Sequence, residues 1–312
     1  MRRDLQVLYT LCSEGATVNF RDTYILHDLI YYSKYTLFSP RDALKVLLKY
    51  GASRSRSLHA IAMSGCVSSI KILVDAGADI EELWENMTPL TRAASRHDAH
   101  VVRGFIDAGA NVNGAGELAL FATVKGCDYS SASIAETLTI LCDAGAGVNR
   151  LNHDNHSILS YAMTTFRIDK PCKVPAVLRA LCQAGIDVNM HHRVLSRVVK
   201  GGDTPLHIVT RLGTHGRNRK RVILECMEIL ISYGADVNSQ NDRGQTPLHC
   251  TVHYSYLEGA QLLLKHGSRL DIKDVYGRTP LMLAMCKKNA KVINLLKNGH
   301  FRYPTMALHL VF

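Results

Sequence analysis

The sequence has few of the features that mark membrane-spanning, secreted or disordered proteins. It contains no run of 18 uncharged apolar residues, and its opening, MRRDLQVLYTLCSEGATVN, lacks the apolar core and cleavage site of a secretory signal. Only 8 of the 312 residues are proline, whereas 47% are hydrophobic, so the chain can bury a large core. These absences predict a folded, soluble protein of the cytoplasm, with the nucleus as an additional location.

Signs of a metal centre or a redox site are also scarce. The nine cysteines form no CxxC pair, and the closest two are Cys172 and Cys182. Two HxxH pairs occur, at His97–His100 and His153–His156, but neither has a third ligand nearby in sequence. We therefore predict reduced thiols, solvated loop histidines, no metal and no other cofactor.

Catalytic motifs are absent as well. The chain has no GxxxxGK[ST] or GxGxxG phosphate loop, no GxSxG nucleophile turn and no HExxH helix. Polar residues with catalytic potential are scattered along the chain instead of converging on one place. The prediction is that this protein is not an enzyme and has no catalytic residue.

What the sequence does contain is a recurring phrase built on a glycine that ends an apolar run. Examples are EGATVN, AGADIE, AGANVN and YGADVN. Such a glycine supplies the left-handed residue that stops a helix. The spacings range from 26 to 49 residues and cluster around 33, and the glycines are Gly15, Gly51, Gly77, Gly109, Gly145, Gly185, Gly234, Gly267 and Gly299.

A second phrase lies between these glycines and predicts where helices begin. It is clearest in DTPLHIVT, QTPLHCTV and RTPLMLAM. The hydroxyls of Thr204, Thr246 and Thr279 can cap a helix whose first residue is proline, a residue that lacks the N–H this position leaves unpaired. Each repeat is therefore predicted to run turn, helix, turn, helix.

The two phrases together resemble the ankyrin-repeat family, most clearly over residues 202–299, where NDRG precedes one TPLH phrase. Weaker copies such as MTPLTRAA and SLHAIAMSG extend the resemblance along most of the chain. The resemblance implies an all-α solenoid of stacked helix–turn–helix repeats joined by β-hairpin-like fingers. We expect a single array over residues 1–312 with eight to nine repeats, and incomplete repeats at 1–19 and 300–312. Neither end of the array is a polar cap, so we expect either that the sequence is part of a longer protein or that another segment covers the end faces.

Departures from the regular repeat predict where the array is irregular. Four repeats carry extra residues between their two helices, at 31–40, 125–133, 164–175 and 211–221. These insertions should lie at an edge that is free of stacking constraints. Conversely, only a tight turn fits between Gly51 and His59.

The resemblance also implies a function. In this family the fingers and the exposed side of the first helices form a concave surface that binds partner proteins. The chain is therefore expected to be a non-catalytic scaffold or adaptor, and substrate recognition for a ubiquitin ligase is one form of that role. No SOCS box or F-box is recognisable in it. The oligomeric state and the hydroxylation of asparagines such as Asn189 and Asn238 stay open.

The repeat register names candidate partner contacts in the fingers and at the ends of first helices. We expect the aromatic and arginine members of this set to dominate the binding energy. The alternative for Trp84 and Tyr276 is that they only pack neighbouring fingers. The predicted contacts are Trp84, Arg96, Arg211, Arg243, Gln245, His253, Tyr254, Val275, Tyr276, Arg278 and Lys287.

A net charge of +10 and a basic run in the insertion at 211–221 suggest further partners. The run comprises Arg217, Arg219, Lys220 and Arg221, and it could serve an acidic protein, a nuclear import receptor or nucleic acid. The plain interpretation is a solvated loop. The missing aromatic stacking platform disfavours direct nucleic-acid binding. The alternative function is therefore a nuclear or nucleic-acid-associated regulatory protein that uses residues 217–221.

Overall fold

The computed structural model describes residues 2–19, 24–33, 40–125, 131–165, 174–191, 201–212 and 217–302. Over these residues the regular elements are helices, with two isolated β-bridges, Trp84 to Met87 and Leu151 to Ser157, in the fingers. The predicted all-α repeat fold is confirmed. The chain divides into two compact units, unit 1 over Met1–Val148 and unit 2 over Asn149–Phe312. The number of repeats remains a prediction.

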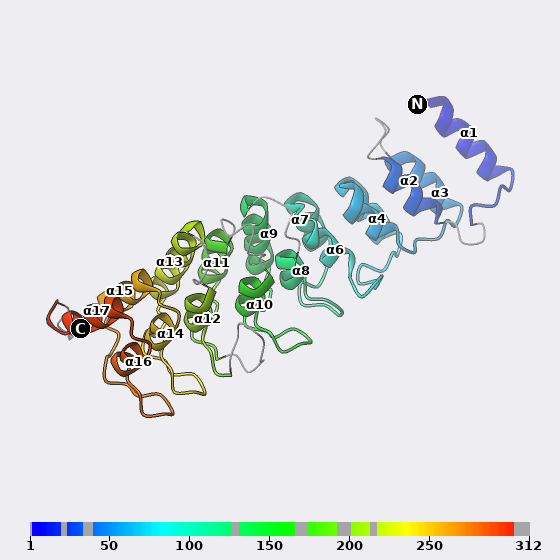
Figure 1. The fold of residues 1–312 in the computed structure, drawn as a ribbon. Helices are drawn as coiled ribbons and strands as arrows, with labels where there is room; N and C mark the ends of the chain where they lie inside the picture. The colour runs from blue at the N-terminus through cyan, green and yellow to red at the C-terminus, as the bar shows by residue number, and fades with distance from the viewer. Residues whose placement is uncertain are drawn as a thin grey trace, which may run out of the picture. The chain divides into compact units, whose positions relative to one another are not determined.

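Unit 1 is built from two rows of helices (Figure 1). The first helices of its repeats, α2, α4, α6 and α8, pack successively on one another. The second helices form the other row, with α1 on α3 and α7 on α9. The elements are α1 (Arg2–Ser13), α2 (Ile25–Ser33), α3 (Arg41–Lys49), α4 (Ser57–Ser64), the 3-10 turn η1 (Val67–Ser69), α5 (Ile70–Asp75), α6 (Pro89–Ser95), α7 (Ala99–Asp107), α8 (Ala119–Lys125) and α9 (Ser131–Asp143).

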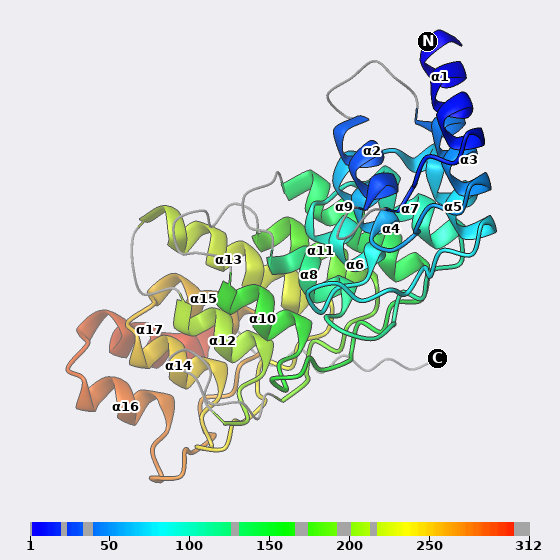
Figure 2. The same ribbon diagram turned by 90° about the vertical axis from the view of Figure 1, so that its right-hand side faces the viewer.

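Unit 2 repeats the same plan (Figure 1, Figure 2). Its first helices pack in the order α10, α12, α14 and α16, and its second helices in the order α11, α13, α15 and α17. The fingers extend from the row of first helices. The elements are α10 (Ile158–Thr165), α11 (Val174–Gln183), α12 (Pro205–Leu212), α13 (Arg217–Ser232), α14 (Pro247–His253), α15 (Leu257–Lys265), α16 (Pro280–Cys286) and α17 (Ala290–Arg302).

The helix starts follow the capping chemistry predicted from the TPLH phrases. Thr246 accepts a hydrogen bond from the backbone N–H of His249 at 3.4 Å, and Thr279 accepts one from that of Met282 at 3.3 Å. In both helices proline is the first residue. Thr88 caps α6 in the same way, accepting from the backbone N–H of Thr91 at 3.2 Å.

The helix ends follow the predicted glycines, with one exception. Eight of the nine glycines have positive φ, for example +88° at Gly234, a conformation that L side chains rarely adopt. Gly299 was predicted to end a helix, but α17 continues through it to Arg302. Each of the other glycines is followed by a small or apolar residue such as Ala235, which is buried. At Gly299 the next residue is His300, which is neither small nor apolar.

Asparagines near the start of each finger tie consecutive repeats together. In unit 1, the Asn113 side chain donates to the carbonyl oxygen of Gly145 at 2.9 Å and accepts from the N–H of Gly147 at 2.8 Å. In unit 2, Asn189 makes the same pair of bonds with Gly234 and Asp236. Both the donor and the acceptor of each amide are used, so these side chains fix the spacing of neighbouring repeats.

The histidine of the TPLH phrase provides a second tie between repeats. His59 Nε2 lies 2.9 Å from the carbonyl oxygen of Glu82, His207 Nε2 lies 2.8 Å from that of Gln245, and His249 Nε2 lies 3.0 Å from that of Arg278. Each bond reaches the finger of the following repeat. His27 differs, because its buried Nε2 has no hydrogen-bond partner among the described residues.

The shortened connection after Gly51 explains the exception. As predicted, residues 55 and 56 form a tight turn, with Arg56 at a φ of 58°. The turn is held by Glu82, whose carboxylate accepts from the Arg56 N–H at 2.8 Å and from the Ser55 hydroxyl at 2.7 Å. A turn this short presents no finger carbonyl to His27.

Candidate functional site

The fingers before α14 and α16 in unit 2 are each held in a fixed conformation by one side chain. In the finger before α14, the Asn241 side chain accepts from the backbone N–H groups of Arg243 and Gln245, both at 3.0 Å. In the finger before α16, Asp274 does the same for Tyr276 at 3.0 Å and Arg278 at 2.9 Å. A backbone bond of 3.0 Å from Val275 N–H to the Arg243 carbonyl oxygen joins the two fingers. The loops therefore present their outward side chains at fixed positions.

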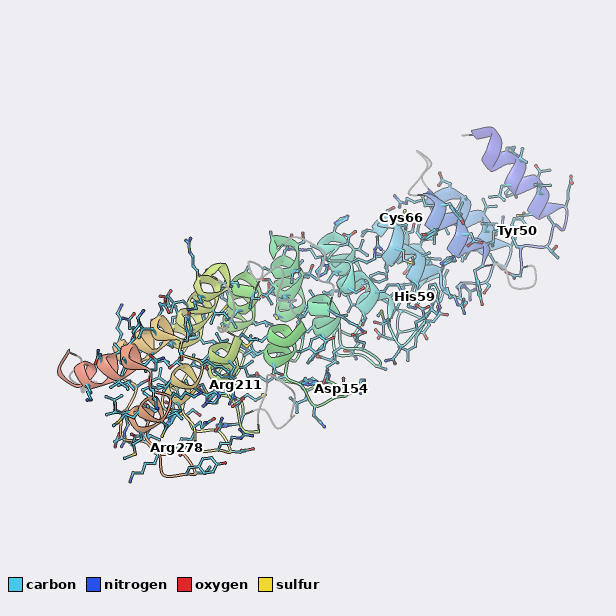
Figure 3. All side chains as sticks on the ribbon, in the orientation of Figure 1. Tyr50, His59, Cys66, Asp154, Arg211 and Arg278 are labelled. Atoms are coloured by element: carbon cyan, nitrogen blue, oxygen red, sulfur yellow. The ribbon has the colours of Figure 1, made fainter. Side chains whose placement is uncertain are left out.

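The finger before α16 presents an exposed apolar pair. Val275 is 61% exposed and Tyr276 is 73% exposed. The Arg278 guanidinium lies 4.7 Å from the Tyr276 ring centre and makes two bonds to Asp274 Oδ2, of 2.9 and 2.7 Å. Burial opposes ionisation of Asp274, but the bonds from Arg278 and from the backbone hold its pKa below the usual value. Arg278, which is labelled in Figure 3, is thus an internal brace that lies against the Tyr276 ring.

The ends of the first helices contribute polar and aromatic groups next to these fingers. His253 and Lys287 are exposed, and Tyr254 is half-buried. The rings of His253 and Tyr254 meet edge to face with centres 4.9 Å apart. Partial burial lowers the pKa of His253, and the positive charges of Lys287, Arg211, Arg278 and Arg243 lower it further. Charges from two fingers and from the helices α12 and α16 therefore act on His253 at the end of α14.

The side chain of Arg211 is not exposed as the repeat register predicted. Its side chain is only 6% exposed and pairs with the fully buried Asp203 at 2.9 Å (Figure 3). Asp203 also accepts from the Asn241 side chain at 2.8 Å. The arginine therefore joins α12 to the following finger and is not a partner contact. Sequence position alone could not reveal this, because His253 holds the equivalent place in the next repeat and is exposed.

Trp84 in unit 1 follows the packing alternative. The Arg56 and Arg92 guanidiniums lie 5.0 and 4.5 Å from its ring centre, and His59 and His27 meet it edge to face at 5.5 and 5.9 Å. Arg92 also donates to the Trp84 carbonyl oxygen at 3.1 Å. This half-buried indole fills the space between neighbouring repeats. Arg96, also predicted as a contact, is exposed.

The basic run is helical and does not form the solvated loop of the plain interpretation. Helix α13 begins at Arg217, so the run forms its first turns. Lys220 is half-buried, with its Nζ 6.0 Å from the Tyr256 ring centre, while Arg221 is exposed. The Tyr256 hydroxyl donates to the Lys220 carbonyl oxygen at 2.8 Å. The side chains of Arg217 and Arg219 lie outside the described residues.

The histidine and the two cysteines described next are packed into the repeat structure. His97, predicted to be solvated, is buried, because its ring bonds to the next first helix, with Nε2 2.7 Å from the Thr123 carbonyl oxygen of α8. Burial raises the pKa of Cys142 and Cys182 to about 11, which keeps them as thiols. Across the described ranges, no three His, Cys, Asp or Glu side chains are placed to hold a metal ion.

Two exposed methionines were missed from the sequence. Met282 and Met285 are 49% and 56% exposed on α16. They occupy the register positions that His249 and Val252 hold on α14, where both residues are buried. The replacement of the TPLH histidine by Met282 was the available signal.

Family comparisons agree with this geometry. Residues 220–303 match the profile described as "Ankyrin repeats (3 copies)", and residues 58–106 match "Ankyrin repeats (many copies)". These are ankyrin repeats. The matched segments lie in both units, and membership of this family supports a protein–protein interaction role. Among the helices that the structure describes, none has the length and apolarity needed to cross a bilayer.

Curated relatives share the ankyrin repeats over part of their length. Mouse Rabankyrin-5 is 31% identical over 117 residues, which is 36% of this chain and 9% of that protein. Chicken NF-kappa-B inhibitor alpha is 32% identical over 105 residues, covering 34% of this chain and 31% of that protein. Human Neurogenic locus notch homolog protein 2 is 27% identical over 187 residues, 58% of this chain and 6% of that protein. The chain thus spans less than a third of the length of these relatives.

Proposed function

We propose that this ankyrin-repeat chain is a non-catalytic adaptor that binds a partner protein on the finger side of unit 2. The observation that carries the proposal is the exposed Val275–Tyr276 pair, held in place by Asp274 and Arg278. Large apolar side chains kept in water by a rigid loop are typical of binding anchors. Because the loop already holds these side chains in place, little further conformational entropy is lost when a partner binds.

The remaining predicted contacts surround this anchor. Arg243 is exposed and Gln245 half-exposed on the neighbouring finger, while His253, Tyr254 and Lys287 stand at the ends of α14 and α16. Such a mixture, with an aromatic centre and a polar rim, fits a protein interface. Arg211 and Trp84 are not included in the proposed interface, because Arg211 is paired with Asp203 and Trp84 is packed against Arg56 and Arg92.

A pull-down with the full chain as bait tests the proposal. The bait carries Tyr254→Ala together with Tyr276→Ala, and bound proteins are quantified by mass spectrometry against the unchanged chain. The matched control is Tyr233→Ala, which removes a 41% exposed tyrosine at the end of α13, on the second-helix row. Partners lost with the double variant and kept with the control support the proposal. Partners indifferent to the double variant, with unchanged circular dichroism, overturn it.

A finer form of this role is substrate recognition for a ubiquitin ligase in the cytoplasm. The family's use as interaction modules supports it. The same pull-down tests it, since the role requires ligase subunits among the partners and a bound protein that is degraded more slowly when Tyr276 is replaced. Unchanged degradation of every Tyr276-dependent partner would exclude this form.

The second candidate is a nuclear role for the basic run at the start of α13. Its support is the exposed Arg221 in a helix whose opening carries several cations, where the helix dipole does not favour them. Replacing Arg217, Arg219, Lys220 and Arg221 by serine should then shift the protein out of the nucleus. A location that stays the same by fluorescence microscopy rejects this candidate.

A further inference from the structure

The cations on the finger side of unit 2 differ in whether their charge is already neutralised. Arg211 is paired with Asp203, and Arg278 with Asp274. Arg243 and Lys287 are exposed and have no ion-pair partner among the described residues. These two side chains therefore carry positive charge that is available to a partner.

The acidic groups of the same fingers do not cancel this charge. Asp274 is buried and bonded to Arg278, and the exposed Asp271 is paired with Arg269 at 2.6 Å. Asp242 is exposed, but its carboxylate lies against Gly201 and Gly202, on the side of the preceding finger. Partial burial is the first cause of the lowered pKa of His253 and the charge of Lys287 is the second, so this unpaired cation lies near the histidine.

Next to this charge lies the apolar pair of the finger before α16. Val275 is bonded through its backbone to Arg243, so the anchor and the cation are neighbours. The Arg278 guanidinium lies within cation–π distance of the Tyr276 ring, and the ring remains 73% exposed. We call the six residues Arg243, His253, Tyr254, Val275, Tyr276 and Lys287 the basic finger surface.

We propose that the partner presents to this surface an acidic peptide segment with one large apolar side chain. The apolar side chain covers Val275 and Tyr276, and Asp or Glu carboxylates flank it at Arg243 and Lys287. This inference rests on the proposed function and narrows it to one class of partner sequence. The reason is complementarity, since unpaired cations beside an apolar anchor match carboxylates beside an apolar residue.

Nucleic acid fits this surface less well than a peptide does. Nucleic-acid affinity comes mainly from many phosphate contacts along a strand, whereas the basic finger surface as defined contains two unpaired cations, Arg243 and Lys287. Single-stranded nucleic acid would also need successive aromatic platforms, and Tyr276 is one exposed ring. Competition with nucleic acid is therefore an outcome of the test.

The test selects binders from a library of random dodecapeptides against the full chain. We expect the selected sequences to be enriched in Asp and Glu on both sides of a Leu, Phe or Trp. The affinity of a selected peptide, measured by fluorescence polarisation, should fall about tenfold or more on Arg243→Glu together with Lys287→Glu. It should also weaken with added salt.

A control variant separates surface charge from total charge. Lys265→Glu with Lys297→Glu makes the same change in net charge, on exposed lysines of α15 and α17 in the second-helix row of unit 2. Binding should stay within about twofold of the unchanged chain, because exposed charges separated by more than a Debye length are screened. Equal losses in both double variants would overturn the inference.

The outcomes distinguish this inference from the proposed function. Selected peptides that depend on Tyr276 but are not acidic would overturn the acidic class and leave the adaptor role intact. An empty selection, or peptides indifferent to Tyr276→Ala, would count against both. Random duplex DNA that displaces the acidic peptides and binds more tightly than they do would assign the surface to nucleic acid, and so overturn the inference.

Discussion

The two units use aromatic and arginine side chains in their fingers in opposite ways. In unit 1, the guanidiniums of both Arg56 and Arg92 lie over the Trp84 ring, and His27 and His59 meet it edge to face. In unit 2, one arginine lies at Tyr276 and most of the ring faces solvent. The comparison teaches that residue type alone does not mark a binding anchor. The number of neighbours that reach the ring decides whether it packs repeats or meets a partner.

The largest expected effect concerns the ion pairs of the two units. The pair of Arg211 with Asp203 is buried, whereas the pair of Arg92 with Glu85 has a carboxylate that is 67% exposed. Asp203→Ala should destabilise unit 2 by about 3–5 kcal/mol, because it leaves a buried guanidinium unpaired. Glu85→Ala should cost unit 1 about 1 kcal/mol or less. Urea unfolding with hydrogen exchange at α12 and α6 measures both. Equal losses would show that burial does not separate these pairs.

The next effect is a dependence of unit 2 on pH through His207. Burial lowers the pKa of His207 to about 4, while an unfolded histidine takes a proton near pH 6.5. The stability contributed by the neutral ring is therefore complete above about pH 6.5 and is lost as the pH falls toward 4, by up to about 3 kcal/mol. His207→Gln should flatten this part of the curve of stability against pH. An unchanged slope would mean that other groups cause the acid sensitivity.

A smaller effect tests the two aromatics directly. Trp84→Ala should destabilise unit 1 by about 2 kcal/mol, less than a fully buried tryptophan would cost because the indole is half-exposed. Tyr276→Ala should change stability by about 0.5 kcal/mol or less, as exposed substitutions usually do. Thermal unfolding followed by circular dichroism checks both values. If Tyr276→Ala proves the more damaging, the comparison of the two units is reversed.

The smallest effect should be the same in both units. Gly77 and Gly234 have φ of +86° and +88°, and an added Cβ would meet no atom within 4 Å at either position. Alanine at each should therefore cost about 1–2 kcal/mol from backbone strain alone. Asparagine should cost less, because it tolerates this conformation. If chemical denaturation showed a clearly larger loss of stability at one glycine than at the other, backbone strain alone would not explain it, and that glycine would have a role in packing.

The sequence by itself determined the repeat plan, since its causes are local. Glycine at a left-handed position and threonine before proline act within a few residues, so helix ends at Gly77 and Gly234 and helix starts after Thr246 and Thr279 were predictable. At Gly299, where the prediction failed, the local sequence also differs, since a histidine follows the glycine in place of a small or apolar residue.

Only the tertiary structure decided which predicted contacts are free. Arg211 and His253 share one register position. Arg211 is buried and paired with Asp203, which also accepts from Asn241, whereas His253 is exposed. Trp84 and Tyr276 both lie in fingers, but Arg56, one of the two arginines over the indole, comes from the preceding repeat. The bond from Asn241 to Asp203 and the contact of Arg56 with Trp84 join residues of different repeats, so the pattern within one repeat does not encode them. Whether a finger side chain is exposed therefore depends on how the repeats stack, because side chains of an adjacent repeat can cover it.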